Sequence, residues 1–126
     1  MRLLGIDYGS KRIGLAITDP SGFFPAPYDV IENNKQSISK IKKICKDREI
    51  GKIIIGQSLN YEGQENIIAK KISEFADKLF EEIELPIDWE REILTTKETE
   101  RFFGRDKLND ARAAALILKS YIDSHK

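Results

Sequence analysis

The chain has 126 residues, of which 40% are hydrophobic, and its 21 Lys and Arg side chains balance its 21 Asp and Glu side chains. This length predicts a single globular domain, residues 1–126, with a core of normal size. A net charge of zero argues against a protein that coats nucleic acid without specificity. The single cysteine excludes an internal disulfide, and the lone histidine lies at the frayed C-terminus, which argues against histidine-based catalysis.

The sequence predicts no membrane partner. No apolar run approaches the length of a membrane-spanning helix, and the first residues predict a strand rather than a signal peptide. We therefore expect a cytoplasmic protein. Charge is uneven along the chain, with an acidic middle and two basic ends, and this permits a local basic face carrying Lys11, Arg12, Arg101, Arg105, Lys107 and Arg112. Ordinary solvated surface charge is the alternative interpretation.

Hydrophobic patterning predicts three strands in the first third of the chain. Residues 2–8 and 12–18 read as two strands around a tight turn, and the second has Ile13, Leu15 and Ile17 at alternate positions, as expected of a half-exposed strand. A third strand covers about residues 23–31. It contains Pro25 and Pro27, which favour the edge of a sheet or a bulge.

Helices and strands are expected to alternate in the rest of the chain. Apolar residues recur at helical spacing over residues 38–45 and 68–79, and short strands follow at residues 52–56 and near 86–91. Thr95 and Glu98 have the spacing of a capping box, which predicts a short helix that stops near Gly104. The last helix is predicted from about Asn109, its N-cap, to Ser124, with Leu108, Ala111, Ala115, Leu118 and Ile122 on one face. This order predicts a mixed sheet with helices on its faces.

Three carboxylates stand beside the ends of predicted elements. Asp7 ends an apolar strand, Glu92 follows the fifth strand, and Asp110 opens the last helix. Burying a charged carboxylate is costly unless it is paired or bound to a metal, and carboxylates without histidine or thiolate suit Mg²⁺ or Mn²⁺. Two such ions can hydrolyse a phosphodiester. Structural alternatives are a turn aspartate at Asp7 and a favourable helix dipole at Asp110.

Four segments together resemble the YqgF/RuvX family. They are DYGSKRIGLA at residues 7–16, GQSLN at residues 56–60 with Gly63, EILTT at residues 92–96, and DARAA at residues 110–114, continuing through Leu118 to Tyr121. The match covers nearly the whole chain. Members of this family are bacterial ribonuclease H-like proteins, described as Holliday junction resolvases and as nucleases that mature the 5′ end of 16S rRNA.

The resemblance implies an α/β ribonuclease H-like fold, a mixed five-stranded sheet with its first three strands antiparallel and helices on both faces. It implies an endonuclease in which Asp7, Glu92 and Asp110 are the catalytic residues and metal ligands. They would hold two Mg²⁺ or Mn²⁺ ions, one generating the attacking hydroxide and the other stabilising the 3′-oxygen leaving group. The candidate substrate-binding residues are Lys11, Arg12, Asn60, Thr95 and Arg112.

The expected partner is nucleic acid, either an rRNA precursor or branched DNA. A symmetric DNA junction would require a homodimer with two active sites, whereas trimming one RNA strand requires only a monomer. The sequence does not choose between these two states.

The sequence departs from the family pattern in two places. Arg91 and Ile93 flank the glutamate where members usually have Asp and Arg, and Gln57-Ser58 replaces a pair that usually ends in proline. Glu90 lies two residues before Glu92 and is the alternative ligand if a bulge shifts the register. These departures favour a first alternative, a noncatalytic ribosome-assembly or nucleic-acid-binding factor with a vestigial site.

A second alternative is an ATP-binding half domain of the actin type. Residues 5–10, GIDYGS, also resemble the phosphate-binding hairpin of that superfamily. Those proteins close two domains over the nucleotide, and the length of this chain predicts one domain only.

Overall fold

The computed structural model of the protein describes residues 1–58, 65–92 and 107–125. Its elements follow in the order β1 (Arg2–Tyr8), β2 (Arg12–Thr18), β3 (Pro25–Glu32), α1 (Ser37–Asp47), β4 (Ile50–Ser58), α2 (Glu65–Ile83), β5 (Ile87–Glu92) and α4 (Lys107–Ser124). The strands form one five-stranded sheet in the order β3-β2-β1-β4-β5. None of the helices in these ranges is long and apolar enough to cross a membrane.

The sheet is mixed, as predicted. Strand β2 pairs antiparallel with both β1 and β3, whereas β4 pairs parallel with β1 and with β5. The two-proline strand β3 lies at one edge, and its register with β2 shifts between Leu15 and Ala16, where Pro27 enters the pairing. The proline signal for an edge strand and a bulge is therefore confirmed, because both places spare a proline from donating a ladder hydrogen bond.

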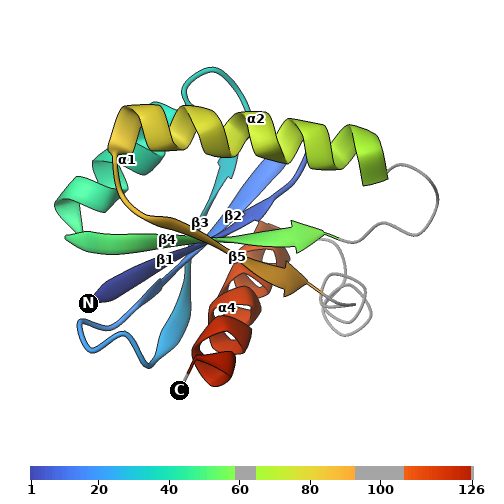
Figure 1. Ribbon diagram of the computed structural model, residues 1–126. Coiled ribbons are helices and arrows are strands. Elements are labelled where there is room, and N and C mark those ends of the chain that lie inside the picture. Colours follow the sequence, from blue (N-terminus) through green and yellow to red (C-terminus); the bar gives the residue numbers. More distant parts are fainter. Residues whose placement is uncertain (59–64, 93–106, 126) are drawn as a thin grey trace.

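Helices cover both faces of this sheet, with α1 and α2 on one side and α4 on the other (Figure 1). Side chains alternate along β1, so Leu4 and Ile6 pack under α1 and α2, while Leu3 packs under α4. The same alternation assigns Gly5 and Asp7 to the α4 side. The strand therefore brings its final carboxylate to the face that α4 covers.

Two further residues pack on the side of the sheet that α1 and α2 cover. Cys45 is only 5% exposed in the core beneath α1, and burial raises the pKa of its thiol to about 11. Trp89 of β5 packs against the same core. Both residues are therefore part of the structural core on the side of α1 and α2.

The predicted start of the last helix is wrong. Helix α4 begins at Lys107, so Asn109 lies inside its first turn and is not the N-cap. Its first turn contains a single apolar residue, Leu108, and one apolar position is too few for periodicity to locate the end of a helix. The buried stripe is also rotated, because Ala114 is fully buried and Ala115 only partly. The capping box of Thr95 and Glu98, with the short helix ending near Gly104, lies outside the described residues.

The predicted strand ends differ from the observed ones by up to two residues. Strand β4 covers Ile50–Ser58, β5 ends at Glu92, and β3 covers Pro25–Glu32. Differences of this size are ordinary for strand boundaries assigned from sequence.

Candidate functional site

Strands β1, β4 and β5 are parallel, so their carboxyl ends lie at the same end of the sheet. Asp7 is the next-to-last residue of β1, and Glu92 is the last residue of β5, where its backbone pairs with Ser58 of β4. The side chain of Glu92 lies outside the described atoms. This end of the sheet is where ligands bind in open α/β sheets, so the strands place these two sequence positions where the prediction requires them.

Gly14 brings the start of α4 into contact with the sheet beside Asp7. It pairs with Asp7 across β1 and β2, and a Cβ atom on it would lie 1.9 Å from the carbonyl oxygen of Asp110. Only a residue without a side chain allows this approach of helix backbone to strand backbone. Two of the three predicted carboxylate residues, Asp7 and Asp110, are thus brought together through one glycine.

Asp110 keeps one buried oxygen that accepts no hydrogen bond in the described part of the chain. The Nε atom of Arg12 lies 3.0 Å from this Oδ2 atom in an ion pair, but the contact lacks hydrogen-bond geometry. The carboxylate also lies in the first turn of α4, where the helix dipole favours negative charge. A buried carboxylate oxygen in this state retains a lone pair for a hard cation, so the residues present fit a divalent metal.

The turn that carries Lys11 and Arg12 is held by Asn33. The Nδ2 atom of Asn33 donates to the carbonyl of Gly9 at 2.7 Å, and its backbone N–H donates to the carbonyl of Lys11 at 2.9 Å. Sequence reasoning missed Asn33, although the Asn33-Asn34 pair after a predicted strand is a recognisable turn signal. The basic turn therefore has a fixed backbone next to the carboxylates.

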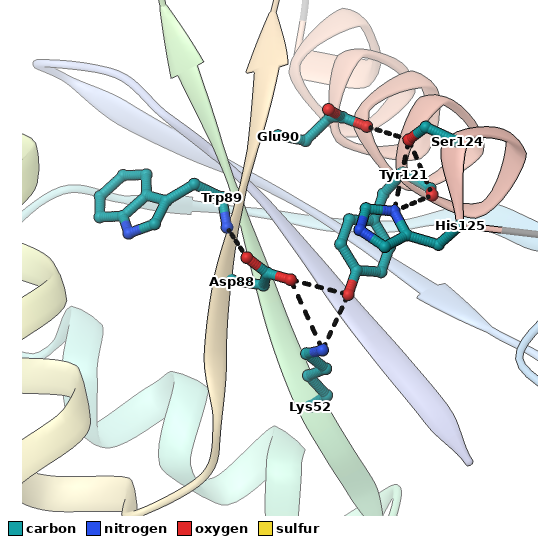
Figure 2. Close-up of polar contacts among 7 residues, drawn as sticks. All are labelled: Lys52, Asp88, Trp89, Glu90, Tyr121, Ser124 and His125. Carbon is teal, nitrogen blue, oxygen red and sulfur yellow. Dashed lines mark hydrogen bonds and ion pairs between the residues drawn. The ribbon is translucent and has the colours of Figure 1, made fainter.

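The alternative ligand, Glu90, lies at the other end of α4. Its Oε2 atom accepts a hydrogen bond from Ser124 Oγ at 3.2 Å, in the last turn of the helix (Figure 2). Ser124 follows Asp110 by 14 residues, which is roughly 21 Å along a helix axis. The choice between Glu92 and Glu90 stays a prediction, but the described contacts do not bring Glu90 to Asp110.

Near that same end, Lys52, Asp88 and Tyr121 form a polar cluster that sequence reasoning did not identify. Lys52 Nζ donates to Tyr121 Oη at 2.8 Å, and Tyr121 Oη donates to Asp88 Oδ2 at 2.9 Å (Figure 2). Lys52 Nζ also lies 3.6 Å from the same Asp88 oxygen. The phenol bond is the main cause that raises the pKa of Lys52 and lowers the pKa of Asp88. Every member of this cluster is therefore bonded within the protein.

The remaining predicted site residues are only partly placed. Lys11 is exposed in the turn after β1, and Arg112 is half-buried on α4. Asn60 and Thr95 lie outside the described residues. Within residues 1–58, 65–92 and 107–125, no three His, Cys, Asp or Glu side chains gather as a metal site. The assignment of Asp7, Glu92 and Asp110 as metal ligands therefore stays a prediction.

The fold has solved counterparts among DNA junction resolvases. The RuvC protein of T. thermophilus, solved in complex with a Holliday junction substrate, matches this chain with a TM-score of 0.64. The match covers 99% of this chain and 96% of that one at 13% sequence identity, which shows the fold. The chain therefore has the ribonuclease H-like architecture of RuvC-like proteins, as expected.

The sequence pattern of the RuvX family, described as Holliday junction resolvase, matches residues 1–124, and the chain belongs to that family. A relative from Dictyoglomus turgidum, named "Putative pre-16S rRNA nuclease", is 35% identical over 134 residues, covering 98% of this chain and 95% of the relative. A relative of the same name from Thermoanaerobacter pseudethanolicus is 36% identical over 137 residues, covering 100% and 99%. Family membership supports a nuclease role, that of a hydrolase acting on phosphodiester bonds.

Proposed function

We propose that this protein is a metal-dependent endonuclease that processes the 5′ end of precursor 16S rRNA. The names of relatives that are 35% and 36% identical over nearly the full length support the RNA substrate. One structural observation carries the proposal, the buried Oδ2 atom of Asp110, which accepts no hydrogen bond in the described part of the chain. Such an atom beside the end of β1 is suited to binding a cation.

Membership of a nuclease and resolvase family implies a divalent cation in general, and we propose Mg²⁺ or Mn²⁺ because the donors are carboxylate oxygens. Asp7 and Asp110 would hold the metal, with Glu92 as the third ligand. Two ions bound there would supply an activated water and stabilise the departing 3′ oxygen. The bound cations would also offset the mutual repulsion of the three acids.

Basic residues of the turn and of α4 would orient the RNA strand. Arg12 lies 3.0 Å from Asp110, so its guanidinium is close enough to bind a phosphate at the same centre. Lys11 is adjacent and exposed, and Arg112 lies one turn into α4. We assign substrate contacts to these three residues, and to Asn60 and Thr95 from their motifs.

A second candidate substrate is a four-way DNA junction. The family description names Holliday junction resolvase, and the RuvC structure with the same fold contains such a junction. A junction has two symmetric strands to cut, so this activity would require a homodimer, whereas RNA trimming would require only a monomer. We rank RNA first because the relatives that bear its name are far more similar in sequence. Such a substrate would place the protein in the cytoplasm.

The test is cleavage of a labelled precursor 16S rRNA fragment and a labelled four-way junction in Mg²⁺ or Mn²⁺. The variant Asp110→Asn removes the charge, and Asp77→Asn makes the same change at an exposed position of α2. We expect RNA cleavage that is lost in Asp110→Asn and retained in Asp77→Asn. Cleavage of the junction alone would favour the second candidate, and RNA binding without cleavage in either metal would favour a noncatalytic assembly factor.

A further inference from the structure

A pocket of about 300 Å³ opens on the side of the sheet opposite to Asp110, between the start of α1 and the middle of α2. Tyr8, the last residue of β1, lines it together with Phe75 of α2 and Asn33. Its volume is at the lower end of the range for small-molecule sites. No part of the proposed cleavage chemistry uses this pocket.

The charged residues that line the pocket are mostly basic. Lys35, Lys71 and Lys78 face a single acid, Glu74, which leaves an excess of two positive charges. All four side chains are exposed, and none of them forms an ion pair within the described part of the chain. Ammonium groups gathered without a carboxylate partner attract an anion such as a phosphate.

The pocket also offers an aromatic surface. The rings of Tyr8 and Phe75 are 4.9 Å apart between centroids and inclined at 50°. Phe75 is only 7% exposed and packs against the ring of Tyr8, whereas Tyr8 is half-buried and keeps part of its surface accessible. A supported, partly accessible ring is the type of surface on which nucleobases stack.

Hydrogen bonds fix the wall of the pocket at the start of α1. Ser37 Oγ donates to the carbonyl of Glu32 at 2.8 Å and accepts from the backbone N–H of Asn34 at 2.8 Å. The side chain of Asn34 in turn accepts from the backbone N–H of Gln36 at 2.9 Å. A wall that is already ordered lowers the entropy lost when a ligand binds.

The pocket is connected to the proposed cleavage site through two residues. Tyr8 directly follows Asp7, and the two point to opposite sides of the sheet. Asn33 lines the pocket and also holds the turn of Lys11 through the two hydrogen bonds described above. A nucleic-acid strand that passes the carboxyl end of β1 at Asp7 would therefore meet Tyr8 on the other side of the sheet.

We propose that this pocket binds one nucleotide of the RNA strand next to the cleavage position, with its base on Tyr8 and its phosphate among Lys35, Lys71 and Lys78. The inference rests on the proposed function for the identity of the strand. The pocket would recognise an aromatic base joined to a phosphate, and every nucleotide has these two groups. A free mononucleotide is therefore the alternative ligand.

The test measures binding by the full chain in EDTA, where cleavage cannot occur. The probes are a six-nucleotide single-stranded RNA, AMP, and ribose 5-phosphate, which lacks the base. The variant K71Q/K78Q removes two pocket charges, and K42Q/K43Q removes two exposed charges of α1 outside the pocket. We expect K71Q/K78Q to weaken RNA binding on the order of tenfold and to lower the slope of log affinity against log salt concentration by about 1. K42Q/K43Q should change both the affinity and the slope by less.

A second measurement locates the ligand. In ¹H–¹⁵N NMR spectra we expect AMP to shift the amides of Tyr8, Ser37 and Phe75, and ribose 5-phosphate to shift them much less. Y8L should weaken AMP binding while thermal unfolding shows that the variant folds. Equal shifts with both probes, shifts elsewhere only, or equal RNA binding by both lysine variants would overturn the proposal.

The same data distinguish a nucleotide of an RNA strand from a free mononucleotide. They also distinguish failure of the pocket proposal from failure of the proposed function. RNA binding much tighter than AMP binding indicates a strand nucleotide, and equal affinity indicates a free mononucleotide and overturns the strand assignment. If the wild type fails to cleave RNA in Mg²⁺ or Mn²⁺ but AMP binds in the pocket, the proposed function fails and the nucleotide site stands. If the wild type cleaves RNA and AMP does not bind in the pocket, the proposed function stands and the nucleotide site fails.

Discussion

The two ends of helix α4 hold polar residues in opposite states. At the first turn, Asp110 has a buried oxygen that accepts no hydrogen bond in the described part of the chain, with only the misaligned Arg12 beside it. Near the last turn, Tyr121 donates to Asp88 and accepts from Lys52, so these groups are bonded to one another. One helix therefore carries an incompletely bonded carboxylate and a completed cluster.

This contrast distinguishes polar groups that stabilise the fold from polar groups that are available to a ligand. A completed network has used its donors and acceptors and contributes to the folded state, while a buried acceptor without a donor costs free energy that a ligand can recover. By this criterion we propose that the metal binds at the start of α4.

The largest effect is expected from charge removal at the first turn. Asp110→Asn should lower RNA cleavage by at least about a hundredfold, because a neutral amide binds a divalent cation much more weakly. Tyr121→Phe, at the completed cluster, should change cleavage less than about twofold and cost roughly 1 kcal/mol of unfolding free energy. Initial cleavage rates and thermal unfolding measure both effects. Equal loss of cleavage in the two variants would contradict the distinction.

The next effect concerns how the helix reaches the sheet. Gly14→Ala should destabilise the fold by about 1 to 3 kcal/mol and reduce cleavage, because its Cβ would lie 1.9 Å from the backbone oxygen of Asp110. Gly51→Ala is the matched control, since its nearest neighbours are side-chain atoms of the exposed Met1, which can move aside. Urea unfolding of both variants measures the contrast. A Gly14→Ala variant as stable and active as Gly51→Ala would refute the close approach.

A smaller effect is expected from Arg12, whose side chain is 41% exposed. If Arg12 binds the scissile phosphate, Arg12→Gln should raise KM for RNA roughly tenfold and change kcat less. Its ion pair with Asp110 contributes at most about 1 kcal/mol to stability at this exposure. Steady-state kinetics separate the two roles, and an unchanged KM with lowered stability would assign Arg12 a structural role only.

The smallest effect is a pH dependence at the completed cluster. The hydrogen bond from Tyr121 is the main cause that lowers the pKa of Asp88 below its ordinary 3.8. The ionised Asp88 carboxylate therefore adds to the free energy of unfolding above pH 3.8, and this contribution is lost as the pH falls through the lowered pKa. We expect the free energy of unfolding of the wild type to exceed that of Asp88→Asn by less than about 1 kcal/mol at pH 7, and this difference to narrow as the pH falls below 3.8. Thermal unfolding of both proteins at pH 7, 4 and 2 measures the difference in stability. A difference that does not change with pH would contradict the link between the ionisation of Asp88 and stability.

Sequence reasoning predicted the sheet because strand signals are local. Alternation over residues 12–18 and the two prolines of β3 sufficed for two strands and for the position of one at an edge. The start of α4 was predicted too late, at Asn109, since a single apolar residue in the first turn, Leu108, does not define a helical period. Local patterns therefore defined the elements better than their ends.

The site was predictable from sequence only in part. Asp7 stood out because a charged residue ends an apolar strand, but its proximity to Asp110 depends on Gly14, and no spacing rule relates these three positions. The bond between Lys52 and Tyr121 spans 69 residues and was not predicted at all. Contacts between distant segments depend on the packing angle of α4, which periodicity does not specify.

The most direct test of the incompletely bonded carboxylate is paramagnetic broadening by Mn²⁺ in the ¹H–¹⁵N NMR spectrum of the full chain. At substoichiometric Mn²⁺ we expect the amide signals of Asp7, Gly14 and Asp110 to broaden, while those of Asp88 and Tyr121 stay sharp. Asp110→Asn should greatly reduce the broadening. Broadening centred on Asp88 and Tyr121, or unchanged broadening in Asp110→Asn, would contradict the assignment of the metal centre to the start of α4.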